Sequence, residues 1–488
     1  TLAAALFVAA FTTMNWQLYR GLLVPHGDSA MYEEHLWNLE HGKGFRSYLD
    51  RGLFLGEHIQ VIHLLLIPVH LVWPSLMAME MCQSLALASG AIPVYWIAQR
   101  HTRCSRSAAL LAVAYLLYFP LHFLDVSIDL KTFRPGSFGV PALEDFAIVC
   151  APLGVWLARR PTPGDSKRDD VRRSRWFGAV LALFATAYFF LVVMVVLPWF
   201  RGGVEIHYVG YLSKYGTTAG EVVQNLLAHP GMWLGDLLSA RSLLFALFVV
   251  APVGFAPLWS PGRAAVGIPL FVLLCLNELT VGDVYPRHHF HAPLVPIVFW
   301  ASAAGLGNVG GLWETIRISR KASASRSSGN GARRALIWES HFVWASAFAT
   351  GMLVSLGPLG RSFWDPGSDY HWRSLYVPGP RAEMFARIAG TIPKASRVAS
   401  TDFVHPRFTH HERSYDYSDY PRAVNDFQPG APPDTDYIVI DTRHPYSKFR
   451  RADQIPEFRD NPDAWELLPD DTDGYFIVLR RRNDAPRQ

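Results

Sequence analysis

Long segments with almost no charged residues run through the first 358 residues of this chain and restrict it to a membrane-embedded fold. A helix that crosses the hydrocarbon core of a bilayer needs roughly 20 apolar residues. On that criterion we predict about ten membrane-spanning helices. They lie near residues 2–22, 59–74, 76–98, 107–123, 136–158, 176–199, 240–259, 264–280, 292–312 and 335–357.

Two of these segments differ from an ordinary span. Segment 59–74 is short and contains His63, Pro68 and His70, which favours a re-entrant or interfacial helix. Segment 136–158 contains Glu144 and Asp145. Acidic groups inside a span are energetically costly and usually functional. The alternative is that these two carboxylates lie at a loop edge, and both interpretations stay open.

Charged residues are unevenly distributed along the chain. They make up 18% of the sequence, against about a quarter in an average soluble domain. The deficit is confined to residues 1–358, which we assign to a polytopic transmembrane domain. Residues 359–488 have ordinary polarity and are predicted to form a soluble α/β domain. Its expected elements are a helix at 382–392 and strands at 397–401, 437–440 and 475–479, with a further strand following Asp463.

Clusters of basic residues predict the topology. Loops 159–175 and 317–334 are rich in Lys and Arg, so both are expected to be cytoplasmic. The last span then carries the C-terminal domain to the periplasm of a bacterial inner membrane. Arg100, Arg103 and Arg106 would also favour the cytoplasm. If all ten predicted spans cross the membrane, these arginines lie on the periplasmic side. They lie on the cytoplasmic side if segment 59–74 does not cross the membrane.

Other compositional features exclude several classes of protein. The net charge of +4 is small and comes from clustered loops, so no nucleic-acid surface is expected. The four cysteines lie in or beside apolar segments and have no zinc-ligand spacing. The chain starts directly in an apolar run at Thr1 without Met, as expected if its natural start lies upstream. No cleavage site for a signal peptide follows.

The first external loop, residues 24–58, contains several carboxylates and imidazoles. Transfer of a sugar with inversion needs a carboxylate that accepts the proton of the acceptor hydroxyl. Asp28 follows the first span and is placed for that role, although it could equally cap a helix that starts at Ser29. Glu57 and His58 allow the same two interpretations, catalytic or capping. The Glu33–Glu34 pair is predicted to be a solvated helix face.

A second polar cluster occupies residues 283–291, just before the ninth predicted span. Arg287 could bind a lipid phosphate in a bidentate manner, with His288 and His289 as additional donors. The alternative is interfacial packing. We predict no metal site here, because His288, His289 and His291 do not share one face of a helix.

The order of short motifs resembles that of a family of bacterial predicted membrane proteins, domain of unknown function 2079. The first loop contributes Asp28, Leu36-Trp37-Asn38 and Gly56-Glu57-His58. Phe133-Arg134-Pro135 matches a motif in which the family more often has His at the position of Arg134. Further matches lie at 211–216, 252–255, 285–296, 392–398 and 436–441.

This family is similar to the type C glycosyltransferases, which use polyprenyl-phosphate sugars and carry a carboxylate in the first external loop. The resemblance implies Asp28, Glu57 and His58 as catalytic candidates. It implies Arg287, His288, His289 and Arg134 as candidates for binding the donor phosphate. A divalent metal ion stays open as a cofactor. One departure is that residues 140–143 run directly into Glu144, where the family would have a loop and a further helix start.

The resemblance therefore predicts a membrane glycosyltransferase that moves a sugar to a lipid or cell-envelope acceptor. One alternative is a non-catalytic subunit of a larger membrane complex that keeps the transferase-like fold and contacts other membrane subunits. A transporter ranks third, because inverted repeats are typical of transporters and the sequence has no matched halves.

Overall fold

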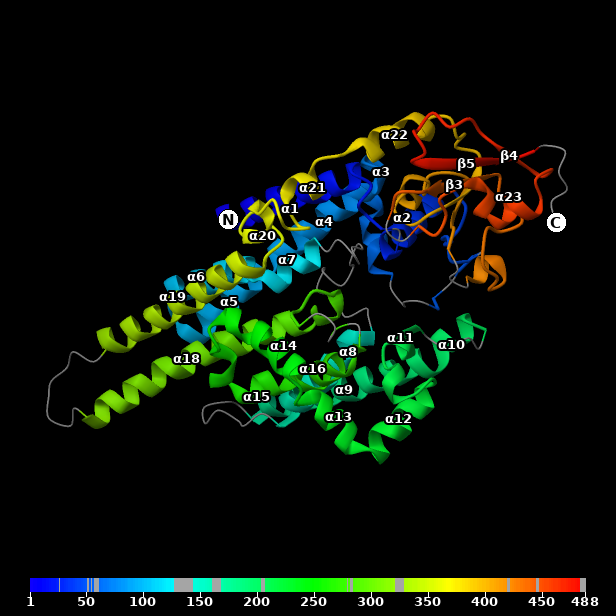
Figure 1. Ribbon diagram of the computed structural model, residues 1–488. Coiled ribbons are helices and arrows are strands. Elements are labelled where there is room, and N and C mark those ends of the chain that lie inside the picture. Colours follow the sequence, from blue (N-terminus) through cyan, green and yellow to red (C-terminus); the bar gives the residue numbers. More distant parts are fainter. Residues whose placement is uncertain are drawn as a thin grey trace.

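The computed structural model describes most of the chain and combines a helical body with a small sheet near the C-terminus (Figure 1). The described residues are 1–25, 27–50, 52–53, 55–56, 61–126, 144–159, 168–202, 207–278, 280, 284–320, 329–418, 422–444 and 447–482.

One group of helices packs around α18 and α19. Its closest pairings are those of α5 with α6, of α18 with α5, and of α19 with α6. The members of this group are α1 (Leu2–Arg20), α4 (Leu76–Ser89), α5 (Ala91–Thr102), α6 (Ser105–Leu117), α7 (Phe119–Asp125), α18 (Leu294–Arg320) and α19 (Gly329–Val354).

A second group of helices lies below α18 in the view of Figure 1. Its longest members, α8 and α9, form a hairpin in which Gly154 and Gly178 face each other's helix. The helices are α8 (Glu144–Arg159), α9 (Arg168–Leu191), α10 (Leu197–Phe200), α11 (His207–Gly210), α12 (Ala219–Ala228), α13 (Pro230–Leu237), α14 (Ala240–Val250), α15 (Pro261–Ala264) and α16 (Ile268–Leu276).

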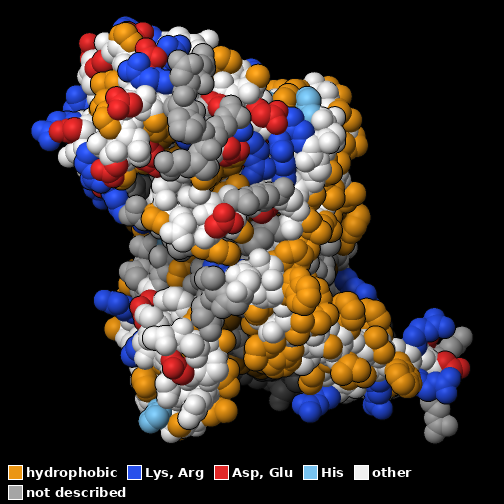
Figure 2. Space-filling view, turned by 90° about the vertical axis from the view of Figure 1, so that its right-hand side faces the viewer, with side chains coloured by type: hydrophobic (Ala, Val, Ile, Leu, Met, Phe, Trp, Pro, Cys, Tyr) orange, Lys and Arg blue, Asp and Glu red, His pale blue; other side chains and the backbone are white. Residues whose placement is uncertain are grey.

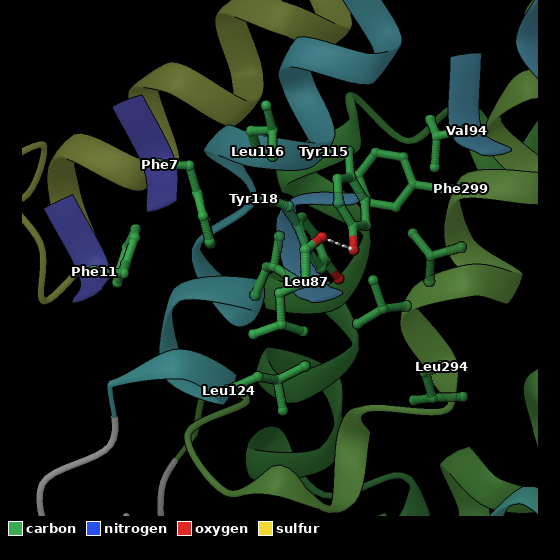
Figure 3. Close-up of a cluster of buried hydrophobic side chains, with 14 of the residues drawn as sticks. Phe7, Phe11, Leu87, Val94, Tyr115, Leu116, Tyr118, Leu124, Leu294 and Phe299 are labelled. Carbon is green, nitrogen blue, oxygen red and sulfur yellow. Dashed lines mark hydrogen bonds between the residues drawn. The ribbon is translucent and has the colours of Figure 1, made fainter. Parts of the chain in front are cut away.

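Aromatic side chains form the centre of the first group (Figure 3). Tyr115 donates a hydrogen bond of 2.9 Å to the carbonyl oxygen of Leu87, which joins α6 to α4. The ring of Phe299 meets Tyr115 and Tyr118 edge-on, with centroids 5.2 Å away in both cases. Such pairs are favourable aromatic geometries, and they anchor α18 to α6.

The predicted count of ten spans is not confirmed. Two helical stretches among the described residues are long and apolar enough to cross a bilayer, Leu76–Thr102 and Asp169–Phe200. Two bent pairs, 105–125 with a 48° bend and 230–253 with a 50° bend, raise the number to four if each is one span. The other predicted segments contain helices among their described residues, but these are shorter or more polar.

The surface of the helical body is apolar over large areas (Figure 2). On the span 169–200, Leu183, Phe184 and Trp199 have exposed fractions of 73%, 67% and 80%. Charged side chains gather instead on the C-terminal domain at the top of that view. A helix with exposed apolar residues on most sides is suited to contact with lipid.

The length of segment 59–74 bears on the predicted side of Arg100, Arg103 and Arg106. Its helical part consists of five residues, Ile62–Leu66, followed by six in α3 (Ile67–Val72). At 1.5–2.0 Å per residue these cover about 20 Å, less than the roughly 30 Å of a hydrocarbon core. This length agrees with the re-entrant or interfacial helix that the sequence favours for this segment.

The basic corner between α5 and α6 also lies near the start of α19. Arg333 lies beside Cys104, and Arg106 Nη2 is 3.3 Å from His341 Nε2. The end of α18 and the start of α19 are at the opposite end of the molecule from the sheet (Figure 1). The basic corner between α5 and α6 therefore lies in the same part of the molecule as the ends of α18 and α19 that flank the predicted loop 317–334.

The C-terminal domain contains a five-stranded sheet of order β2-β1-β3-β5-β4. The first three of these are parallel, and β5 joins β3 and β4 antiparallel. The strands are β1 (Arg397–Ser400), β2 (Arg413–Asp416), β3 (Tyr437–Asp441), β4 (Trp465–Leu467) and β5 (Phe476–Arg481), accompanied by α22 (Pro380–Ala389) and α23 (Pro456–Asp460). The short helices α20 (Arg361–Trp364) and α21 (Trp372–Tyr376) pack on α19 and α1 of the helical body.

The domain closes over the first loop of the chain. This loop contains α2 (Gly27–Glu40), which lies next to the sheet in Figure 1. Lys43 Nζ lies 2.6 Å from Glu412 Oε2, and Val424 N donates to the Leu49 carbonyl at 3.0 Å. Arg381 also donates to the carbonyl oxygen of Leu22 at 2.7 Å. Residues 22–50 are therefore enclosed between the helices and the C-terminal domain.

Candidate functional site

The predicted catalytic residues are only partly described by the structure. Glu57, His58 and Arg134 lie outside the described residues, and Asp28 is described in its backbone alone. Helix α2 begins at Gly27, so Asp28 belongs to its first turn and does not precede a helix that starts at Ser29. A negative charge is favourable in the first turn of a helix. The catalytic assignments remain predictions.

The predicted phosphate-binding residues form one turn before α18. The guanidinium of Arg287 lies over the ring of Tyr370, 5.5 Å from its centroid, and His288 is buried. His289 packs against Phe290, with ring centroids 4.1 Å apart. The two ring nitrogens of His291 lie at hydrogen-bond distance from the carbonyl oxygens of His288 and Pro120, and the nitrogen that carries the proton donates. His291 therefore packs this turn onto α7.

An apolar cavity of about 670 Å³ begins directly after this turn. Its wall includes Ala292 and Val295 from the start of α18, Leu121 and Leu124 from α7, and Ala86 from α4. None of its lining residues in the described part of the chain is charged. Figure 3 shows Leu87, Val94, Tyr115, Leu124 and Phe299, all lining residues, around this region. The cavity has the size and character of a site for an apolar ligand.

A buried polar cluster lies where α2 meets the C-terminal domain, and it corrects one prediction. Glu33 and Glu34 were expected to face solvent, but their exposed fractions are 1% and 2%. The C-terminal domain covers both, since Thr409 donates to Glu33 at 2.9 Å and Ser414 donates to Glu34. Buried carboxylates persist only when they are paired and hydrogen-bonded, and these two are.

Glu34 connects three parts of the chain. One carboxylate oxygen accepts the backbone N–H of Tyr48 at 2.5 Å. The other lies 3.4 Å from His405 Nε2 and accepts the hydroxyl of Ser414. His405 is itself held by the carbonyl oxygen of Tyr415 at 3.1 Å. Glu34 thus has a structural role between the first loop and β2.

Glu33 faces histidines from two other elements. Its Oε1 lies 3.1 Å from His410 Nε2, in the turn that precedes β2. Burial alone would raise the pKa of Glu33, but the charges of His410 and His70 and the hydroxyl of Thr409 lower it below its ordinary value. Glu33 is therefore ionised at neutral pH.

His70 completes this cluster from α3. Its Nδ1 lies 2.9 Å from each carboxylate oxygen of Glu40, at the end of α2. The side chain of His70 is 0% exposed. In the part of the chain that the structure describes, Glu33, His70 and His410 are close enough to hold a metal ion, with one ligand atom from each within 4.8 Å of the others.

The sequence offered one signal for this cluster. His63 and His70 lie within an otherwise apolar segment. A polar side chain in such a segment needs a hydrogen-bond or charge partner. Their partners come from α2 and from the C-terminal domain, so no local pattern connects them. His63 pairs with His35, with ring nitrogens 3.3 Å apart.

Comparison with known proteins places the chain in a family. The model of the family described as predicted membrane protein (DUF2079) matches residues 22–126 and 142–475. The chain belongs to this family. The DUF2079 match is interrupted at the stretch before Glu144, where the sequence was found to depart from the family's pattern. No curated protein matches the chain.

A solved structure also resembles this DUF2079 protein over its length. It is the crystal structure of ArnT from Cupriavidus metallidurans bound to undecaprenyl phosphate. The two chains are 12% identical, the similarity covers 98% of each, and the TM-score is 0.44.

Proposed function

We propose that this DUF2079 protein is a membrane glycosyltransferase that moves a sugar from a polyprenyl phosphate to a lipid or cell-envelope acceptor. The observation that carries the proposal is the apolar cavity that starts at Ala292, next to the turn containing Arg287. A polyprenyl-phosphate donor has a long apolar chain that ends in a charged phosphate. An uncharged cavity beside a cationic turn fits both parts of such a molecule.

In this proposal Arg287, His288 and His289 bind the phosphate, with Arg134 as a further candidate. Arg287 lies over the face of Tyr370, a contact that orients its guanidinium. The fork suits two phosphate oxygens. Since His291 fixes the turn to α7, the phosphate would be held at a constant distance from the cavity.

The proposed reaction is a displacement at the anomeric carbon of the sugar. The bond from that carbon to the phosphate oxygen breaks, and a bond to the acceptor oxygen forms. Asp28 takes the proton of the acceptor hydroxyl, and the polyprenyl phosphate leaves with the bonding electrons. Glu57 and His58 are the candidates for orienting the acceptor.

Enclosure of α2 by the C-terminal domain supports a reaction that is shielded from bulk water. The ends of α18 and α19 that flank the basic loop 317–334 lie at the opposite end of the molecule. With that loop in the cytoplasm, the C-terminal domain, α2 and Asp28 are on the periplasmic side of a bacterial inner membrane.

The proposal is tested by lipid binding to the full chain, purified in detergent. Replacing Ala86 by Phe places a ring in the cavity and is expected to weaken binding of a polyprenyl phosphate at least about tenfold. The matched control is Ala187→Phe on the exposed face of α9, which should leave the affinity unchanged. Arg287→Gln should weaken binding of the polyprenyl phosphate and leave that of the uncharged polyprenol unaffected.

Catalysis is tested with the same protein and a set of polyprenyl-phosphate sugars. Asp28→Asn should keep lipid binding and abolish release of polyprenyl phosphate, because Asn cannot take up the acceptor proton. If Ala86→Phe and Ala187→Phe bind lipid equally, the cavity is not the donor site. If Asp28→Asn releases polyprenyl phosphate at the wild-type rate, Asp28 is not the base.

A further inference from the structure

We propose that Glu33, His70 and His410 bind one divalent metal ion, with Zn²⁺ as the best-suited ion, and that this ion fastens the C-terminal domain to the membrane domain. The three side chains come from α2, α3 and the turn before β2. Each contributes one ligand atom, and these atoms lie within 4.8 Å of one another. This site is independent of the proposed sugar transfer.

The distances suit a small ion. Zinc binds imidazole nitrogen and carboxylate oxygen at about 2.0–2.2 Å, so two ligands of a tetrahedral ion are about 3.3 Å apart. Glu33 Oε1 and His410 Nε2 already lie 3.1 Å apart. The widest pair has to close by at most about 1.5 Å, which side-chain rotation can supply. Two imidazoles and one carboxylate are a common zinc ligand set.

The ring of His70 provides the independent evidence for a ligand. Its Nδ1 lies beside both oxygens of Glu40, which leaves Nε2 as the nitrogen available to an ion. That Nε2 is buried and has no hydrogen-bond partner among the described residues. A buried imidazole with one nitrogen on a carboxylate and the other unpaired is the arrangement of a metal-bound histidine and its orienting partner.

The alternative to an ion is a pair of protonated histidines, His70 with Glu40 and His410 with Glu33. That state would balance the charges, but it leaves the Nε2–H of His70 buried without an acceptor among the described residues, which is unfavourable. A divalent ion balances the charges of Glu33 and Glu40 equally well and uses that nitrogen. The unpaired Nε2 of His70 therefore favours an ion in this cluster.

The surroundings keep the ligands in place. The ring of His410 stacks on Trp37, with centroids 4.0 Å apart and planes 9° from parallel. Thr409 holds the second oxygen of Glu33 at 2.9 Å. The side chain of His410 is 21% exposed, which gives an ion a route in.

An ion at this position would tie the turn that carries His410 to two elements of the membrane domain. Its loss should therefore loosen the contact between α2 and the C-terminal domain without removing any residue of the apolar cavity. This predicts a metal-dependent stability of the whole chain.

The experiment uses the full chain expressed without a polyhistidine tag and purified in detergent. Elemental analysis is expected to find about one zinc per chain. After removal of the metal with a chelator, added Zn²⁺ should raise the melting temperature by several degrees. Co²⁺ in place of zinc should give the visible absorption of a tetrahedral site with nitrogen and oxygen ligands.

Variants locate the ion. Glu33→Gln and His70→Gln should lose the zinc and the thermal response, while Glu40→Gln should weaken zinc binding about 10–100-fold. His41→Gln is the matched control, since His41 is an exposed histidine that follows α2 and stacks on the same Trp37. The proposal is overturned if metal-free wild-type protein shows no thermal response to Zn²⁺, or if His70→Gln keeps wild-type zinc. Wild-type titration decides the case should a variant fail to fold.

Discussion

Single residues show how the C-terminal domain changes the chemistry of the first loop. Asp50 accepts hydrogen bonds from Ser47 Oγ at 3.1 Å and from Gly52 N at 2.7 Å, and Arg413 donates to its backbone carbonyl. Burial under the C-terminal domain outweighs these contacts and raises the pKa of Asp50 to about 7. Its ordinary value is near 4. The folded protein therefore prefers the protonated carboxyl.

This raised pKa makes stability depend on pH in a defined direction. The stabilisation that the protonated Asp50 adds to the free energy of unfolding is complete below about pH 4. It is lost as the pH rises from about 4 to about 7, and stability does not change further above that pH. Asp50→Asn stays neutral and should be more stable than wild type by about 4 kcal/mol above pH 7, with no difference near pH 4. Melting curves of both proteins from pH 4 to 8 measure this. Exposed Asp453→Asn is the control, and a pH-independent difference between Asp50→Asn and wild type would contradict the assignment.

At the scale of elements, close helix packing depends on glycine at a few positions. A Cβ atom on Gly154 of α8 would lie 2.5 Å from the backbone nitrogen of Ala182 in α9, and one on Gly178 would lie 2.5 Å from the nitrogen of Ala158. The backbones of this hairpin are thus in direct contact, as in helix pairs joined by small residues. No side chain can fit between them.

Gly154→Ala should therefore destabilise the protein although alanine favours helices. Separation of α8 and α9 is expected to lower the free energy of unfolding by about 1–3 kcal/mol. Gly235→Ala in α13 is the matched control, because a Cβ there has nothing within 4 Å and should stabilise by up to about 1 kcal/mol. Thermal melting in detergent compares the two variants. Equal melting temperatures would mean that the hairpin can separate without loss.

The elements also show what the sequence could predict. Apolar length located helices in every described predicted span, and apolar runs located β1, β3 and β5. The apolar length of the segments could not give the number of membrane-spanning helices, because several of these helices are short or bent. Strand β2 was missed, since Arg-Ser-Tyr-Asp has no apolar alternation. Its polar side chains can be buried because residues 34–50 provide their hydrogen-bond partners. Arg413, for example, donates to the carbonyl oxygen of Asp50. The exposure predicted for Glu33 and Glu34 was wrong for the same reason.

The molecule as a whole is polarised along its length. The C-terminal domain, α2 and the buried carboxylate–histidine cluster occupy one end, and the basic α5–α6 corner lies with the start of α19 toward the other (Figure 1). Between them lie the apolar surfaces of α9 and the apolar cavity. A bilayer fits this order, since cations favour the cytoplasmic side and apolar surfaces the hydrocarbon core.

This order predicts opposite accessibility at two exposed aspartates. Asp463 lies in the C-terminal domain, before β4, and Asp169 lies in the first turn of α9, beside the predicted cytoplasmic loop 159–175. In a cysteine-free background, Asp463→Cys in spheroplasts should react with a membrane-impermeant maleimide. Asp169→Cys should react only after permeabilisation, because the bilayer separates it from the reagent. The parental protein without cysteines is the control. Reaction of both variants in intact spheroplasts would place the two sites on one side and remove the periplasmic setting of the proposed transfer.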